Sequence, residues 1–127
     1  MNKRTSKEGL KRIKEFADGI GPEKSQLVNY DQNKKSITPS EFYKNAKELG
    51  LFMHPYTFRI DKLPDYAKTY DELLKIFIDD LKVEGLFTDF SDLTFDFLES
   101  DMNFSVKTKA STSLLFFLTG CFFYFFY

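Results

Sequence analysis

The stretch LFMHPYTFRIDKLPDYAKTYDELLKIFIDDLKVEGLFTDFSD, residues 51–92, decides the fold of this chain. It begins with an aromatic-rich run at 51–58 that has the length of a strand, and a second short apolar run follows at 85–90. Between them, apolar side chains recur at helical spacing from Tyr70 to Leu81. This order predicts a strand, a loop, an amphipathic helix and a second strand, which is one βα unit closing on the next strand.

Three expected helices begin with the pattern Thr-x-x-Glu: TSKE at 5–8, TPSE at 38–41 and TYDE at 69–72. In such a capping box the Thr hydroxyl accepts from the backbone N–H three residues on, and the Glu reaches back to the N–H of the Thr. Pro39 would then occupy the first helical position, where its missing N–H has no consequence. The caps follow one another at the length of a βα unit, roughly 30 residues or more. The alternation predicts an α/β fold with a parallel sheet.

The remaining segments are expected to connect or close these units. A strand-like run at 16–22 precedes a polar segment at 23–37, which predicts a long loop at the functional face. A short apolar pattern after Ser91 predicts a closing helix that ends near residue 98. Residues 99–113 are polar and small, and they predict a linker.

Charge and cysteine content exclude several classes of partner. The 127 residues carry 18 basic and 19 acidic side chains, so the chain has no basic excess for a nucleic acid to bind. Its first residues, MNKRTSKEGLKRIKEF, are charged and lack the apolar core expected of a secretory signal. One cysteine, Cys121, gives no internal disulfide and no information on redox compartment.

The last fourteen residues, LLFFLTGCFFYFFY at 114–127, carry no charge and are almost entirely Phe, Tyr and Leu. They are too few to cross a bilayer, which needs about 20 apolar residues. Three interpretations stay open: a lipobox-like match at 118–121, which is out of place at this end of a chain; a lipid-anchor signal with Ser105 as its small-residue site; and a segment past the natural end of the domain, from a truncated or mis-joined reading frame.

Three segments of the chain resemble the glycerophosphodiester phosphodiesterase family, in its periplasmic bacterial branch. EGLKRIKEFADGIGPEKSQLV at 8–28 resembles a helix–strand segment of that branch, and HPYTFRIDKLPDY at 54–66 resembles its seventh strand and the following loop. GLFTDFSD at 85–92 resembles its eighth strand, with Ser91 where the family usually has Pro. The resemblance covers about residues 7–98 and is specific because the three segments have the right order and spacing.

The resemblance implies a TIM-type (β/α)₈ barrel, of which residues 1–98 would form the C-terminal two to three βα units. It also implies a phosphoric diester hydrolase of lipid and glycerol metabolism, which converts a glycerophosphodiester to glycerol 3-phosphate and an alcohol. The family uses two His residues as general acid and base, and a Ca²⁺ or Mg²⁺ ion held by carboxylates of earlier strands. His54 matches neither His, so we expect no catalytic residue and no metal ligand in this chain, and no metal bound by it alone.

The resemblance carries over only the side chains that would line the substrate site, which we call its wall. The chemistry of such barrels lies at the C-terminal ends of the strands. This rule places His54, Tyr56 and Arg59 beyond the end of one strand and Asp89 beyond the end of the next. Other roles remain open. His54 could be a buried, hydrogen-bonded strand residue, Arg59 could pair with a loop aspartate instead of a phosphate, and Asp89 could start the last helix.

The expected function is therefore that of the C-terminal portion of a glycerophosphodiester phosphodiesterase, inactive as a fragment. The alternative is a non-catalytic, membrane-associated remnant or interaction protein. A glycerophosphodiester would bind only in a complete barrel, no nucleic acid is expected, and membrane contact would occur through residues 114–127. The resemblance and the tail indicate a secreted, periplasmic or membrane-associated protein without deciding among these locations.

Ending the chain at Ser100 is expected to raise its solubility and to leave the helix at 70–81 intact. Burying each large apolar side chain is worth about 1.5–3 kcal/mol, so in water the tail must associate with itself, with exposed helix faces or with a bilayer. Liposome co-sedimentation and far-UV circular dichroism of both lengths measure this. Equal solubility, no tail-dependent liposome binding and loss of helix on shortening would together show that the tail belongs to the fold.

Overall fold

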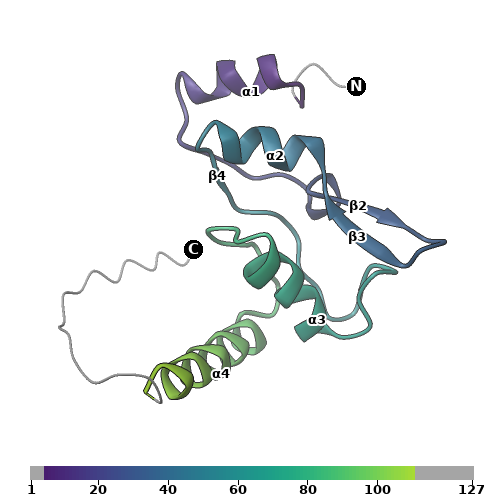
Figure 1. Cartoon of the computed structure of the whole chain (residues 1–127), viewed down its shortest axis with the longest axis vertical. Coiled ribbons are helices and arrows are strands. Elements are labelled where there is room, and N and C mark those ends of the chain that lie inside the picture. Colours follow the sequence, from purple (N-terminus) through teal and green to yellow (C-terminus); the bar gives the residue numbers. More distant parts are fainter. Residues whose placement is uncertain (1–4, 111–127) are drawn as a thin grey trace.

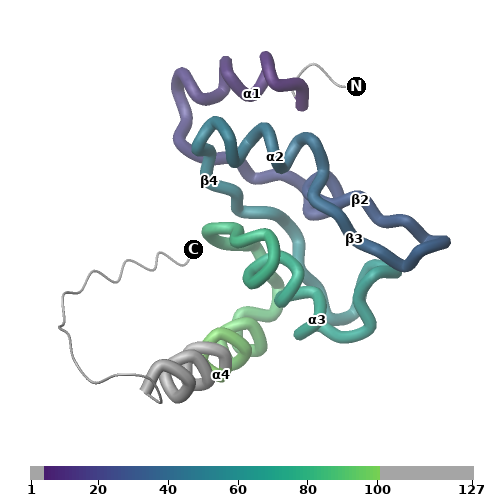
Figure 2. Tube along the Cα trace, viewed as in Figure 1, coloured from purple at the N-terminus to yellow at the C-terminus, as the bar shows by residue number. Residues whose placement is uncertain are grey.

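The structure, a computed structural model, describes residues 5–110 of the chain and the side chains of residues 5–100. The predicted α/β class is confirmed, with helices and short strands that alternate along the trace (Figure 2). The elements in chain order (Figure 1) are α1 (Lys7–Lys14), β1 (Gly19–Ile20), a 3-10 turn η1 (Lys24–Gln26), β2 (Val28–Asp31), β3 (Ser36–Pro39), α2 (Glu41–Glu48), β4 (Phe52–Met53), α3 (Tyr70–Lys75), a π-helical turn η2 (Ile76–Asp80) and α4 (Ser91–Ala110).

Three extended segments run parallel at the centre of the fold. β1 pairs with β4 in a parallel sheet. Further along, Phe58 forms a parallel bridge with Thr88, and the backbone N–H of Phe87 donates to the Pro55 carbonyl oxygen at 3.0 Å. Segment 85–90 therefore lies beside the continuation of β4, although β1 and β4 are each only two residues long. The parallel order follows the prediction from alternating helices and strand-like runs.

The two faces of the central segment differ in burial. Leu51, Met53 and Pro55 are fully buried, and the first two belong to a core that includes apolar residues of α2 and α3. Phe52 and Tyr56, which alternate with them, are exposed. Successive side chains of a strand point to opposite faces, so one face of the sheet is packed on the helices and the other faces outward.

Two of the three predicted helix caps are displaced along the chain. Ser6, not Thr5, caps α1 by accepting from the backbone N–H three residues on. Ser40 caps α2 in the same way, while Thr38 and Pro39 lie in β3 rather than at the helix start. Serine caps a helix at least as well as threonine. The pattern therefore located each helix but not its capping residue.

The third cap and the strongest predicted helix are confirmed. The Thr69 hydroxyl accepts from the Glu72 N–H at 3.1 Å, and the Glu72 carboxylate accepts from the Lys68 N–H at 2.8 Å, one residue earlier than expected. α3 continues into the wider turn η2, where the Leu81 N–H donates to the Ile76 carbonyl oxygen at 3.0 Å. The predicted apolar stripe is buried at Tyr70, Leu73, Leu74, Phe77 and Leu81.

The segment at 23–37 contains most of a β-hairpin, so the prediction of a long loop is wrong. β2 and β3 pair antiparallel, and the hairpin projects from the rest of the fold (Figure 1). The Asp31 carboxylate closes the turn by accepting from the N–H groups of Asn33 and Lys34, and Lys35 adopts a positive φ of 48°. Such Asp-led turns are common. The hairpin escaped the sequence analysis because its mostly exposed strands lack a clear apolar alternation.

The closing helix is confirmed but is longer than expected. α4 begins at Ser91 and continues to Ala110, through most of the segment expected to be a polar linker. Residues 91–110 contain neither Gly nor Pro, the residues that most strongly end a helix, so polarity alone did not stop it. The rest of that segment and the tail at 114–127 lie outside the described residues.

A cluster of hydroxyl groups joins the two halves of the βα unit. The Tyr70 hydroxyl forms hydrogen bonds with the hydroxyls of Thr88 at 2.7 Å and Thr94 at 2.8 Å. The Thr88 hydroxyl also donates to the Phe58 carbonyl oxygen at 3.1 Å and accepts from the Phe90 N–H at 2.9 Å. The first turn of α3, the extended segment 85–90, the end of the 51–58 run and the first turn of α4 thus meet at one phenol.

A partly exposed ion pair fixes the turn after η2. Glu84 accepts from Lys47 of α2 at 2.7 Å and from the backbone N–H of Met53 in β4 at 2.8 Å. Burial raises the pKa of Glu84, but the hydrogen bonds from Lys47 and Met53 and the charge of Lys47 outweigh it, so the pKa is lowered overall. The stabilisation is therefore present at neutral pH and is lost as pH falls through the pKa of the folded state.

Replacing Tyr70 with Phe should lower the free energy of unfolding by about 1–3 kcal/mol, since two partially buried hydrogen bonds are lost. Tyr66 provides the matched control, because its buried hydroxyl has no hydrogen-bond partner among the described residues. Tyr66→Phe should be neutral or stabilising. Urea unfolding of the three chains measures the difference. Equal effects of the two substitutions would show that the hydroxyl cluster does not hold the unit together.

Candidate functional site

The four predicted wall residues lie on two neighbouring segments of the parallel arrangement. His54, Tyr56 and Arg59 follow β4, and Asp89 follows Thr88, which is bridged to that same run. The structure brings Arg59 and Asp89 into direct contact. Within residues 5–100, neither His54 nor Tyr56 forms a hydrogen bond or a ring contact with that pair, so the four form two separate groups along the edge of the sheet.

Arg59 is held by two carboxylates. Its Nε and Nη2 atoms donate to the two oxygens of Asp61 at 3.0 and 2.8 Å, and its Nη1 atom donates to Asp89 at 2.6 Å. The hydrogen bond from Arg59 lowers the pKa of Asp61, and the same pair raises the pKa of Arg59. The structure thus shows the loop-aspartate pairing left open in the sequence analysis. All three side chains are exposed, where such pairs contribute little stability.

His54 is exposed, so the interpretation as a buried strand residue is wrong. Its imidazole meets the ring of Phe87 edge-on, with centroids 6.3 Å apart. It also lies directly over Gly85, where an added Cβ would come within 2.9 Å of the His54 Nε2 atom. Any larger residue at position 85 would displace the ring. The glycine, part of the GLFTDF run, leaves the space that the imidazole occupies beside segment 85–90.

Tyr56 is fixed through its backbone and leaves its ring exposed. Its N–H donates to the Pro22 carbonyl oxygen at 3.0 Å, and its own carbonyl oxygen accepts from the Lys24 N–H at 3.0 Å. The Lys24 ammonium donates to the Thr57 carbonyl oxygen at 2.9 Å. Lys24 is a cation at this edge that the sequence analysis missed. Its position directly after the turn that ends the first strand is the signal that could have identified it.

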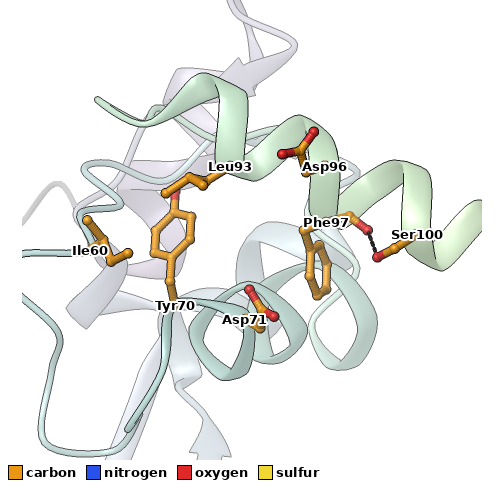
Figure 3. A pocket seen from close by; sticks show the side chains of 7 residues that line it. All are labelled: Ile60, Tyr70, Asp71, Leu93, Asp96, Phe97 and Ser100. Atoms are coloured by element: carbon orange, nitrogen blue, oxygen red, sulfur yellow. Dashed lines mark hydrogen bonds between the residues drawn. The ribbon is translucent and has the colours of Figure 1, made fainter.

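A separate cavity of about 320 Å³ lies between α3, α4 and the loop after Arg59 (Figure 3). The side chains come from both helices and converge on one hollow, with Asp71 on α3 and Asp96 on α4. None of the four predicted wall residues lines it. Its lining consists of Ile60, Tyr70, Asp71, Leu93, Asp96, Phe97 and Ser100.

The described residues do not fit the divalent ion that the family resemblance implies. Within residues 5–100, no three His, Cys, Asp or Glu side chains lie together in a way that could hold a metal. We therefore assign no metal chemistry to them. In the same part of the chain, no helix has the length and apolar character needed to cross a bilayer.

The pKa of Asp61 in the folded chain should lie below its ordinary value, because Arg59 stabilises the carboxylate. Arg59→Gln should raise it towards that value, so the ion pair is present above the folded-state pKa and lost as pH falls through it. Carboxyl NMR titration measures this, and Arg12→Gln on α1 is the matched control. An Asp61 pKa that is the same in Arg59→Gln and in the unaltered chain would show that Arg59 is unpaired in solution.

The curated proteins that are similar to this chain share one family name. No protein-family model matches the chain. It is 30% identical over 91 residues to the glycerophosphodiester phosphodiesterase of Haemophilus influenzae and 32% identical over 91 residues to that of Treponema pallidum. It is also 33% identical over 94 residues to glycerophosphodiester phosphodiesterase GDPD6 of Arabidopsis thaliana.

These matches cover 71%, 71% and 68% of this chain, but only 25%, 26% and 24% of the three relatives. The chain therefore spans about a quarter of the length of the curated relatives it matches. A continuous match of about 90 residues in a chain of 127 must include residues 38–90, so the matched part contains β4, segment 85–90 and the edge at which Arg59, His54 and Tyr56 lie. Over about 70% of its length, this chain is related to a partial region of the glycerophosphodiester phosphodiesterase family.

Proposed function

We propose that this chain is the C-terminal portion of a glycerophosphodiester phosphodiesterase, the last two to three βα units of its barrel. In a complete barrel it would help to hydrolyse a glycerophosphodiester to glycerol 3-phosphate and an alcohol. By itself it would be inactive. The observation that supports this most is the combination of three parallel segments with relatives that share one family name and are matched over only 25% and 26% of their length.

The two faces of the sheet favour a piece of a barrel over a self-contained domain. Leu51 and Met53 are buried on the helix side, while Phe52 and Tyr56 are exposed on the other. In a barrel of parallel strands the helices cover one side, and side chains from all the strands fill the interior. An exposed aromatic side is what a few strands would show when the other strands of the barrel are missing.

We assign the wall residues supporting roles only. Tyr56 and His54 would contact the glycerol or alcohol part of the substrate, as exposed side chains at the carboxyl ends of the strands. Arg59 would tie the loop at 59–61 to the end of the next strand through Asp89. The acid–base His pair, and the carboxylates that hold a Ca²⁺ or Mg²⁺ ion, would come from the rest of the barrel.

The location and further partners follow from the same proposal. A protein of this branch would be secreted, periplasmic or membrane-associated, and residues 114–127 would supply any membrane contact. No nucleic-acid partner is proposed, because the charge is nearly balanced. The second candidate is a non-catalytic interaction protein. The exposed aromatic face of the sheet is the observation that favours it.

The chain alone should release no glycerol 3-phosphate from glycerophosphocholine with added Ca²⁺. Turnover above buffer that is lost in His54→Ala would contradict this, because it would make the only His a catalytic residue.

A chimera tests the positive half of the proposal. The matching segment of the Haemophilus influenzae relative is replaced by that of this chain, and the chimera should hydrolyse glycerophosphocholine. Tyr56→Ala in the chimera should raise KM, whereas Phe95→Ala, an equally exposed aromatic on α4, should leave it unchanged. A chimera that folds by circular dichroism but has no activity would overturn the proposed function.

A further inference from the structure

One face of the sheet carries four ring side chains, with the exposed Glu23, the bridge partner of Tyr56, at its end. We call Phe52, His54, Tyr56 and Phe87 the ring face. Phe52, His54 and Tyr56 alternate along one extended segment, so they point to the same side, and the Phe87 ring meets His54 edge-on from the neighbouring segment. Phe52 is 55% exposed, Tyr56 45% and Phe87 50%. This is the outward side of the sheet described above.

Something must cover this face in solution. Parallel sheets are almost always buried on both sides, because the helices that connect their strands cover both faces. Among residues 5–100, the helices cover only the side that carries Leu51 and Met53. A partner for the ring face has to be apolar and uncharged itself, since burying an unpaired charge against it would be strongly unfavourable.

We propose that the occupant is the chain's own C-terminal segment, residues 114–127. This segment has the required chemistry: it carries no charged residue and is almost entirely Phe, Tyr and Leu. Its last six residues, 122–127, are all Phe or Tyr, and the segment contains no Pro. Aromatic residues favour the extended conformation of a strand, so the segment can lie along a sheet.

The length of the chain allows this return. α4 begins at Ser91, just after the end of segment 85–90, and its 20 residues span about 30 Å. Residues 111–127 can extend at most about 60 Å. The tail can therefore run back along the whole of α4 and still leave about 30 Å of chain, which is roughly its last nine residues and includes the aromatic run at 122–127. Three strands lie about 4.8 Å apart, so that length covers the ring face.

An intramolecular occupant has an advantage over a second copy. A covalent connection of this length gives the tail an effective concentration on the order of millimolar at the face. At micromolar protein, a second copy with the same contacts would be far less abundant. The tail has more aromatic side chains than the ring face, so some of them stay exposed even when the tail is docked. Removing the tail therefore still lowers the exposed apolar surface. This agrees with the higher solubility expected of a shortened chain.

One consequence of this tail contact, the blocking of the substrate wall, rests on the proposed function. His54 and Tyr56 are both in the ring face and in the proposed substrate wall. A tail on that face would block the wall in the free chain and would have to leave when the rest of a barrel covers the strands. The docking itself does not depend on the enzyme assignment.

His54 is the only histidine of the chain, and it provides the probe. Its modification by diethyl pyrocarbonate at low micromolar protein is compared in the full chain and in a chain ending at Ala110, the last residue of α4. The full chain should react about tenfold more slowly, the factor expected when the face is covered nine-tenths of the time. Phe52→Glu in the full chain should abolish the protection, whereas Phe95→Glu on α4, 50% exposed, should preserve it.

Three outcomes would overturn the proposal. Equal rates in the two lengths would show that the tail does not cover the ring face. Protection that rises with protein concentration and persists in the chain ending at Ala110 would assign the face to a second copy. Protection that appears only with phosphatidylcholine–phosphatidylglycerol vesicles would assign it to a lipid surface. Because each readout is the reactivity of His54, failure here leaves the chimera test of the enzyme assignment unaffected.

Discussion

The Tyr70 hydroxyl is the contact on which the rest of the fold depends. It reaches the hydroxyls of Thr88 and Thr94, and Thr88 in turn binds the Phe58 carbonyl oxygen. Because Thr69 caps α3 one residue earlier, the start of that helix is fixed in direction and position at once. The end of one strand-like run, the next extended segment and the first turn of α4 are thereby joined through connected hydroxyl groups.

This single junction determines which side of the sheet is packed. With α3 held against the segment at 51–58, Leu73, Leu74 and Phe77 cover its helix side and are fully buried. The Phe58 and Phe77 rings meet edge-on with centroids 5.0 Å apart, a favourable aromatic geometry. The other side of the sheet receives no comparable layer within the described residues. The proposed enzyme role and the proposed tail contact are two consequences of that asymmetry.

Local patterns predicted the helices well and the site only in part. The period of apolar residues found α3, and the Thr-x-x-Glu pattern found all three helix starts, because both signals depend on neighbours in sequence. The pattern could not choose between Thr38 and Ser40, since either side chain can cap. The length of α4 was missed because a polar composition does not stop a helix. The contact of the His54 ring with Gly85 joins residues distant in sequence, so no local pattern could show it.

The most direct test of the account is native-state amide hydrogen exchange of the whole chain. The central claim is that segments 51–58 and 85–90 lie side by side in the chain as it stands. The N–H groups of Phe58 and Phe87, which donate between these segments at 2.9 and 3.0 Å, should exchange much more slowly than that of Gln32 at the hairpin turn. Exchange of Phe58 and Phe87 as fast as that of Gln32 would contradict it.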